Sequence, residues 1–238
     1  MLNNTKISLI LATLMLLLPI SNAQAMQTVF NVPSADVTPK GRLFVEQESQ
    51  FTPWAPSANW LGTSYTAVGV GHNTEIDATL YNVSAPASNN IVLGTGFKSA
   101  IPIPGLDKKY PAREYKFTVG DEVLTSLQSQ GVGNWAYAHL SGRVPVTNTR
   151  LTSGISTGTR QLFGENKVCF IGAVEQPVTK KLTLLTDWYS GSNNAQGFLI
   201  AGASYALPKE STVFVGYQIP NNANNGKSGF VLELAKTF

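Results

Sequence analysis

Two residues in the middle of the chain have types and spacing that could support catalysis. His139 stands two positions before Ser141, and residues two apart in a strand point to the same side. A histidine within hydrogen-bond reach of a serine hydroxyl can take its proton and make the oxygen a nucleophile. That chemistry also needs an Asn or Asp to orient the imidazole, and none is evident at a matching position.

The residues around most charged positions alternate between apolar and polar types in steps of two, which is the period of a β-strand. Ile76, Ala78 and Leu80, for example, alternate with Glu75 and Asp77. The same pattern occurs over residues 150–156, 182–189 and 230–235. The sequence therefore predicts an all-β fold whose strands have one apolar or small face and one polar face.

Short polar connections recur at intervals of about 31 to 39 residues, and a longer connection rich in Asn, Gly and Ser lies between each two of them. Six such units predict an antiparallel up-and-down barrel of about twelve strands. We place the strands near residues 42–51, 63–72, 74–83, 90–100, 113–124, 134–144, 149–158, 167–176, 181–190, 197–207, 211–220 and 228–238. Between Ser99 and Pro111 two prolines interrupt the pattern, which indicates a long periplasmic turn or a small segment that enters the lumen.

The first 25 residues have the organisation of an export signal. Lys6 precedes an apolar stretch that ends at Ile20, and Ala23 and Ala25 form an A-x-A cleavage site. The stretch is shorter than the about 20 residues of a spanning helix, which disfavours a retained anchor helix. We therefore expect a cleaved signal peptide over 1–25 and a transmembrane barrel over 26–238, with a periplasmic N-terminal segment over 26–41.

The chain ends in an aromatic residue, with apolar residues alternating back from it. These residues are Phe230, Leu232, Leu234 and Phe238. They resemble the C-terminal strand of Gram-negative outer-membrane β-barrels, which the barrel assembly machinery recognises. With the export signal, the resemblance implies a porin-like barrel surrounded by the lipids of the bacterial outer membrane. Lys236 departs from the pattern. A soluble β-sandwich is the alternative, but it gives no reason for the alternation of short and long turns.

In a barrel whose apolar face meets lipid, the polar face lines the lumen. The ionisable residues assigned to the lumen are Glu46, Glu48, Glu75, Asp77, Lys98, Lys116, His139, Arg143, Arg150, Glu175, Asp187 and Glu233. In a conducting barrel, Arg143 and Arg150 would face the acidic residues of the first strands across a narrow polar pore. In the alternative, these charges pair and fill the interior. Space for a pore is left by inward glycines, namely Gly69, Gly71, Gly94, Gly96, Gly154 and Gly158.

The segment His139-Leu-Ser141 resembles the His-x-Ser pair of outer-membrane phospholipase A and of the lipid A deacylases, which are barrel enzymes. In those families the pair lies toward the outer leaflet and acts on lipid. Here it precedes a short turn at Pro145 by a few residues, and its parity with Arg143 points it into the lumen. We therefore expect no enzymatic activity, and a lipid hydrolase that uses His139 and Ser141 is only a second alternative.

Other functional classes find little support. Lys and Arg number 17 against 14 Asp and Glu, a balance that does not indicate nucleic acid as a partner. The single Cys169 cannot form an intramolecular disulfide and is expected as a small buried residue. Metal-ligand clusters and nucleotide-binding loops are not found, so no metal or cofactor is expected. The predicted function is a channel for small polar solutes, with a non-conducting structural or surface-binding barrel as the alternative.

Overall fold

The computed structural model describes residues 27–55, 59–85, 90–160, 164, 167–191 and 196–238. The expected signal peptide, residues 1–25, lies outside the described residues. No helix in the described ranges is long and apolar enough to cross a membrane.

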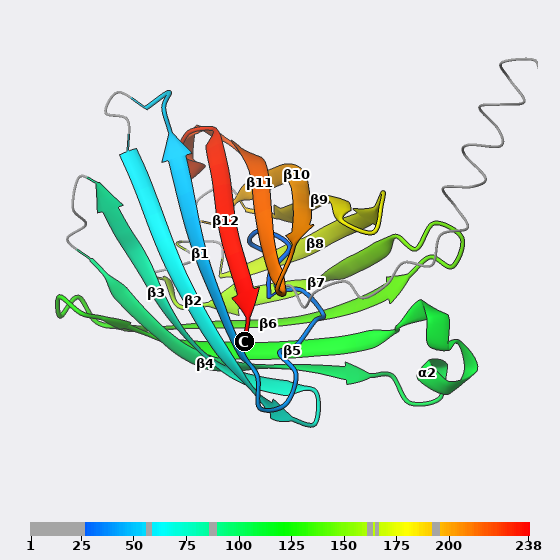
Figure 1. Cartoon of the computed structure of the whole chain (residues 1–238). Coiled ribbons are helices and arrows are strands. Elements are labelled where there is room, and N and C mark those ends of the chain that lie inside the picture. Colours follow the sequence, from blue (N-terminus) through cyan, green and yellow to red (C-terminus); the bar gives the residue numbers. More distant parts are fainter. Residues whose placement is uncertain (1–26, 56–58, 86–89, 161–163, 165–166, 192–195) are drawn as a thin grey trace, which may run out of the picture.

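Twelve antiparallel strands form one closed barrel, in which each strand pairs with its neighbours in sequence and β1 pairs with β12 (Figure 1). The strands are β1 (Leu43–Thr52), β2 (Asn59–Gly71), β3 (Thr74–Ala85), β4 (Val92–Pro102), β5 (Lys116–Ser126), β6 (Val132–Arg143), β7 (Arg150–Gly158), β8 (Val168–Pro177), β9 (Leu182–Tyr189), β10 (Phe198–Leu207), β11 (Ser211–Pro220) and β12 (Gly229–Thr237). The predicted number of strands and the antiparallel barrel are confirmed.

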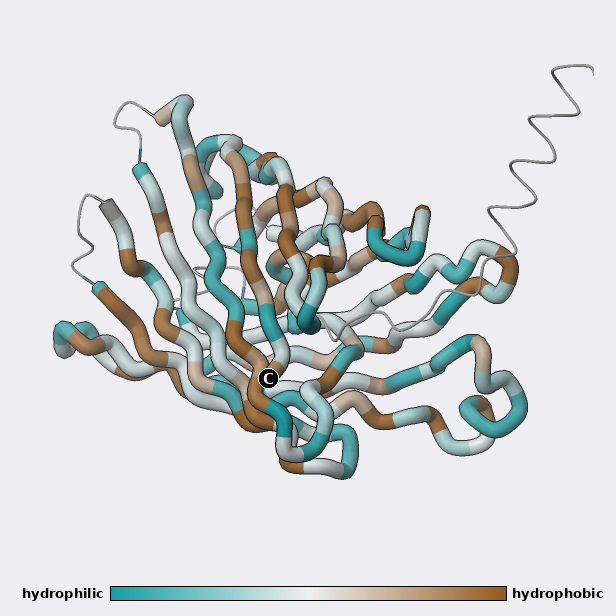
Figure 2. Tube along the Cα trace, in the orientation of Figure 1, coloured by the Kyte–Doolittle hydropathy of each residue, from teal (hydrophilic) through white to brown (hydrophobic). Residues whose placement is uncertain are grey.

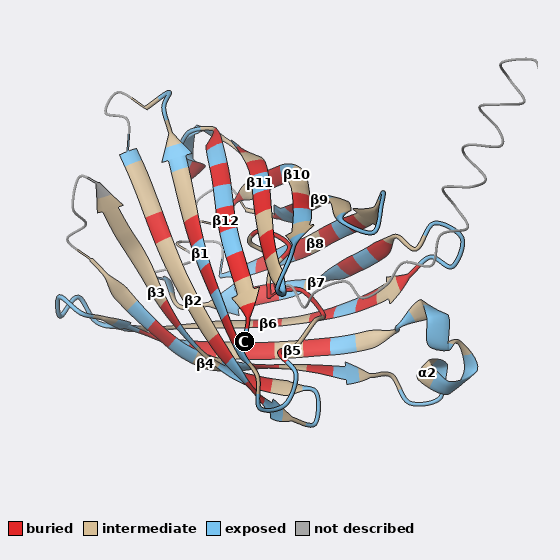
Figure 3. Ribbon diagram, in the orientation of Figure 1, coloured by how far each residue is buried: buried red, intermediate tan, exposed pale blue. Residues whose placement is uncertain are grey.

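The period-2 pattern of the sequence becomes an inner and an outer face of the barrel. Buried and exposed residues alternate along the strands in Figure 3, and hydrophobic and hydrophilic residues alternate in Figure 2. On β12, Phe230, Leu232 and Leu234 are exposed while Val231 and Glu233 between them are buried. A large apolar surface thus faces outward, as lipid requires. One polar exception is Asp121 on β5, whose carboxylate accepts a hydrogen bond from Asn134.

The short connections gather at one end of the barrel. At the β2–β3 turn, His72 and Asn73 have φ values of 52° and 55°, the left-handed conformation of a tight hairpin turn. The β4–β5 connection is longer and contains the helix α2 (Leu106–Lys109) and the 3-10 turn η1 (Pro111–Arg113). α2 lies at the end of the barrel (Figure 1), so this segment is a long turn and does not enter the lumen. Another 3-10 turn, η2 (Ala223–Asn225), lies between β11 and β12.

Residues 27–40, in the range expected as a periplasmic N-terminal segment, fold back into the interior of the barrel. Val29, Phe30 and Val32 are at most 2% exposed. A bridge between Thr28 and Pro33 makes residues 28–33 a tight hairpin, and Lys40 forms a parallel bridge with Gly69 on β2. A Cβ atom at Gly69 would lie 2.2 Å from the backbone oxygen of Thr38. The close approach of this segment, hereafter the N-terminal segment, therefore requires glycine there.

Candidate functional site

A carboxylate on β9 holds the tip of the N-terminal segment. Asp187 Oδ2 accepts hydrogen bonds from the backbone N–H groups of Phe30, Asn31 and Val32, at 2.9, 2.7 and 2.7 Å. Consecutive N–H groups that converge on one oxygen form an anion-binding arrangement. A buried carboxylate needs such donors, and Asp187 is 2% exposed.

Apolar contacts hold the same tip against the strands that follow β7. Phe30 packs in a hydrophobic cluster with Ile171, Ile200 and Phe214. A Cβ atom at Gly216 would lie 2.8 Å from the Phe30 ring, so the ring occupies space that the absent side chain leaves free. The glycine on the inner face therefore makes room for the N-terminal segment. Because the Phe30 ring fills this room, no open passage remains at this point.

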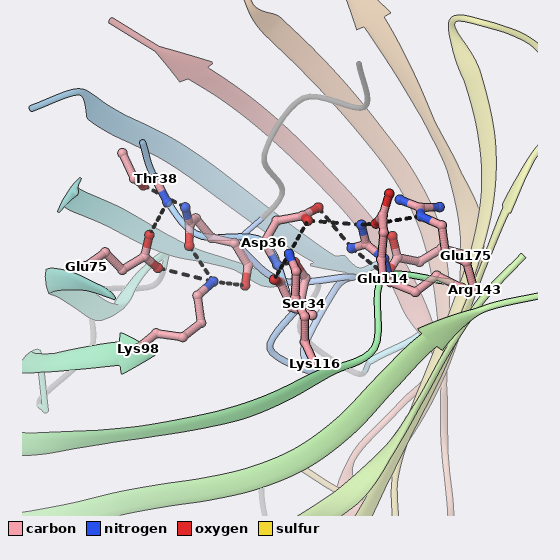
Figure 4. A network of polar contacts seen from close by, with 12 residues as sticks. Ser34, Asp36, Thr38, Glu75, Lys98, Glu114, Lys116, Arg143 and Glu175 are labelled. Atoms are coloured by element: carbon pink, nitrogen blue, oxygen red, sulfur yellow. Dashed lines mark hydrogen bonds and ion pairs between the residues drawn. The ribbon is translucent and has the colours of Figure 1, made fainter. Parts of the chain in front are cut away.

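A bidentate ion pair fixes the segment further along. The two guanidinium nitrogens of Arg150 each lie 2.9 Å from an oxygen of Asp36 (Figure 4 shows the surrounding network). Lys116 Nζ is 3.9 Å from the same carboxylate. Burial by itself would raise the pKa of Asp36, but the positive charges of Arg150, Lys116 and Arg143 more than offset it and lower the pKa from 3.8 to about 2. Asp36 is therefore ionised at neutral pH.

A second network anchors the two ends of the described segment to β3 and β4. Lys98 Nζ lies 3.1 Å from Glu75 Oε1 and donates to the backbone oxygen of Gln27 at 3.0 Å. Glu75 Oε2 accepts from the backbone N–H of Thr38 at 2.7 Å, and the Gln27 side chain donates to Thr38 Oγ1 at 2.8 Å. Figure 4 shows Lys98 joined to Glu75, and Glu75 joined in turn to Thr38. Lys98 and Glu75 are nearly fully buried, so each compensates the charge of the other.

The structure places the side chains of the predicted lumen residues on the inner face. Asp77 and Lys116 are partly buried, and the others are buried: Glu46, Glu48, Glu75, Lys98, His139, Arg143, Arg150, Glu175, Asp187 and Glu233. Their partners differ from the expected ones. Arg143 Nε contacts Glu114 at 2.7 Å and Arg150 contacts Asp36, so neither faces the acidic residues of β1 and β3 across an open pore.

Above the tip of the N-terminal segment, the interior holds a cavity of about 540 Å³. Gln27, Thr28 and Phe30 line it on the side of the segment, and Gln130 and Gln196 line it toward the long connections. Glu46, Glu48, Asp77 and Glu122 also line it, and Lys98 is the only Lys or Arg among the described lining residues. The interior thus consists of an acidic cavity toward the long connections and a filled part toward the short turns.

Three acidic residues that take part in these contacts were not among those predicted. Glu122 on β5 is 4% exposed and accepts hydrogen bonds from Thr79 Oγ1 at 3.0 Å and Tyr81 Oη at 2.6 Å. Glu122 lies an even number of residues after Lys116 on the same strand, so the strand period could have assigned its side chain to the same inner face. Asp36 and Glu114 lie outside the strands, where the strand period carries no information on direction.

The pair His139 and Ser141 does not form a catalytic arrangement. Both residues are buried, at 2% and 5% exposure. Ser141 Oγ has no hydrogen-bond partner among the described residues, so the imidazole does not contact it. The position of the pair on the inner face also keeps it away from the lipid that the resembling enzymes attack.

Comparisons with known proteins place the fold. No family model matches the sequence, and no curated protein matches it. Among solved structures, the KdgM porin in complex with disordered oligogalacturonate is similar with a TM-score of 0.51 and 10% identity, over 83% of this chain and 99% of that chain. The COG4313 outer membrane channel from Pseudomonas putida F1 is similar with a TM-score of 0.53 and 8% identity, over 85% of this chain and 97% of the other. The fold of this chain is therefore that of an outer-membrane β-barrel.

Proposed function

We propose that the chain is a small porin-like channel of the bacterial outer membrane that admits polar solutes from the side of the long connections. The observation that carries the proposal is the polar cavity of about 540 Å³ inside a closed barrel with an apolar outer face. This volume falls in the range of small-molecule sites. The similar solved barrels, which are described as a porin and a channel, add support.

The N-terminal segment would then control the passage. It fills the part of the barrel toward the short turns. Polar contacts with Asp187, Arg150 and Lys98 hold it, together with the apolar packing of Phe30. Polar contacts can exchange with water when the segment moves, so release of the tip would connect the cavity with the other end. The described arrangement corresponds to the closed state of such a channel.

A planar-bilayer recording of the refolded mature chain tests this function. We expect stepwise currents, with a larger open fraction after Asp36→Asn combined with Asp187→Asn, because both changes weaken contacts of the segment. Asp107→Asn on the short helix α2, far from the segment, is the matched control and should leave the currents unchanged. Absence of current through both the wild type and the double variant would contradict the channel and favour a non-conducting structural or surface-binding barrel.

The location has its own test. The export signal, the apolar outer face and the C-terminal residues Phe230, Leu232, Leu234 and Phe238 support insertion by the barrel assembly machinery into the outer membrane. Fractionation of cells should therefore recover the chain with outer-membrane lipids. Recovery as a soluble periplasmic protein would contradict the proposal.

A further inference from the structure

Three glutamates form an acidic wall where β1 and β12 meet. Glu48 on β1 is the direct antiparallel partner of Glu233 on β12, and Glu46 lies two residues before Glu48 on the same face. Their exposed fractions are 6% for Glu46, 9% for Glu48 and 0% for Glu233. Like charges directly opposite each other destabilise a sheet, so a wall of this kind calls for a compensating group.

The described residues supply little compensation to this wall. Glu48 accepts hydrogen bonds from the side chains of Gln50, at 2.8 Å, and Thr63. Glu46 Oε2 and both carboxylate oxygens of Glu233, in contrast, have no hydrogen-bond partner in the described part of the chain. None of the ion pairs found among the described residues involves Glu46, Glu48 or Glu233. The inward bases contact other acids: Lys98 contacts Glu75, Lys116 and Arg150 contact Asp36, and Arg143 contacts Glu114.

The wall opens into the acidic cavity. Glu46 and Glu48 line the cavity, and a second acidic pair, Asp77 on β3 and Glu122 on β5, lines it beyond β2. Neighbouring strands lie about 4.8 Å apart, so β1 and β3, with β2 between them, are separated by about 10 Å across the sheet. Side chains that converge from these strands into one cavity come within reach of the two ends of a short linear molecule.

The remaining lining also fits a cation. The aromatic side chains of Phe30, Tyr65, Tyr81 and Trp135 line the cavity, and aromatic faces attract organic cations. The Gln218 side chain, 2% exposed, has an amide oxygen without a hydrogen-bond partner among the described residues and also lines the cavity. A metal ion fits less well, because no group of three acidic, His or Cys side chains in the described ranges is arranged to hold one.

We propose that the cavity binds a linear organic dication, an aliphatic diamine, with one ammonium group at Glu46 and Glu48 and the other at Asp77 and Glu122. This inference rests on the proposed function, since it names the solute class of the same channel. Binding alone, however, does not require that the barrel conducts. The methylene groups between the two ammonium groups would contact the aromatic side chains.

Three five-carbon compounds that differ mainly in charge test the proposal on the refolded mature chain by calorimetry. Cadaverine carries two ammonium groups, 1,5-pentanediol is its neutral counterpart, and glutarate carries two carboxylates. We expect binding of cadaverine, at least tenfold weaker binding of the diol and no binding of glutarate. The proposal is overturned if cadaverine does not bind or binds no more tightly than the diol.

Variants locate the site. The double change Glu46→Gln and Glu48→Gln should weaken cadaverine binding at least tenfold, whereas Asp107→Asn on α2 should leave it unchanged. Heat-modifiability in gels checks that each variant is folded; if the double variant fails this check, Asp77→Asn on the other side of β2 takes its place with the same expectation. Unchanged binding in a folded variant overturns the proposed site.

A bilayer recording separates the two proposals. Currents with no cadaverine binding would retain the channel and reject the diamine site. Cadaverine binding that depends on Glu46 and Glu48, in a barrel that carries no current even after release of the N-terminal segment, would retain the site and reject the channel.

Discussion

Asp36 shows how a single side chain outside the strands connects the N-terminal segment to the barrel wall. Its carboxylate takes part in a bidentate contact with Arg150, the geometry in which guanidinium and carboxylate interact most strongly. Arg150 also lies 3.4 Å from Glu175, so loss of Asp36 would leave the arginine with a weaker partner. The contact therefore contributes to the stability of the barrel as well as to the position of the segment.

Asp36→Asn should lower the free energy of unfolding by about 2 kcal/mol at neutral pH, because one pKa unit corresponds to about 1.4 kcal/mol. The pKa of Asp36 is lowered from 3.8 to about 2, so its stabilisation is complete above the unfolded value and is lost as the pH falls through the folded value. Urea unfolding in micelles should show a constant difference between wild type and variant from neutral pH to about pH 5, which shrinks between about pH 4 and pH 2. An equal difference at pH 2 and pH 7 would contradict this role.

At the scale of elements, the last strand and the residue after it close the barrel. The backbone N–H of Phe238 donates to the oxygen of Leu43 at 2.7 Å, and the N–H of Leu43 donates to the oxygen of Phe238 at 3.3 Å. The side chain of Arg42 also donates to the Phe238 oxygen. Phe230, at the other end of β12, pairs with Phe51 on β1 and with Tyr217 on β11, and its side chain makes ring contacts with Trp54 and Tyr217.

Deletion of Phe238 should therefore reduce the amount of heat-modifiable barrel in outer-membrane fractions much more than Phe230→Leu does. The deletion removes backbone closure together with the proposed assembly signal, whereas the substitution keeps an apolar side chain on the lipid face. Gel mobility with and without heating measures the folded fraction. Equal and negligible effects of the two changes would argue against a special role for the last residue.

The strands were predictable because lipid outside and polar groups inside impose the period of two. All twelve strands lie within a few residues of their predicted positions, and the direction of Glu75 or Asp187 follows from the same alternation. The N-terminal segment was not predictable in this way, since a short hairpin has no such period. One signal was present: Ile171, Ile200 and Phe214 are apolar at inward positions, and an apolar inner face indicates that something packs against it.

For the whole molecule, the unequal connections predict the orientation in the membrane, since outer-membrane barrels have short turns at the periplasmic end. The native thiol of Cys169 is 1% exposed and gives little background in a labelling experiment. Ala223→Cys in η2, on a long connection, should react with an impermeant thiol reagent on intact cells. Lys180→Cys, in a short turn, should react only after the outer membrane is permeabilised; the reverse pattern would mean that the orientation is inverted.

The contacts of the N-terminal segment also constrain the order of folding. The hydrogen bonds from Phe30, Asn31 and Val32 to Asp187 join positions 155 to 157 residues apart, and contacts of such long sequence separation form slowly. The N-terminal segment therefore cannot form its contacts with Asp187 until β9 has been synthesised. Pairing of β12 with β1 closes the cylinder around whatever lies inside. We therefore expect the segment to dock on an open sheet that already includes β3 to β9, with the seam between β1 and β12 formed as the last step.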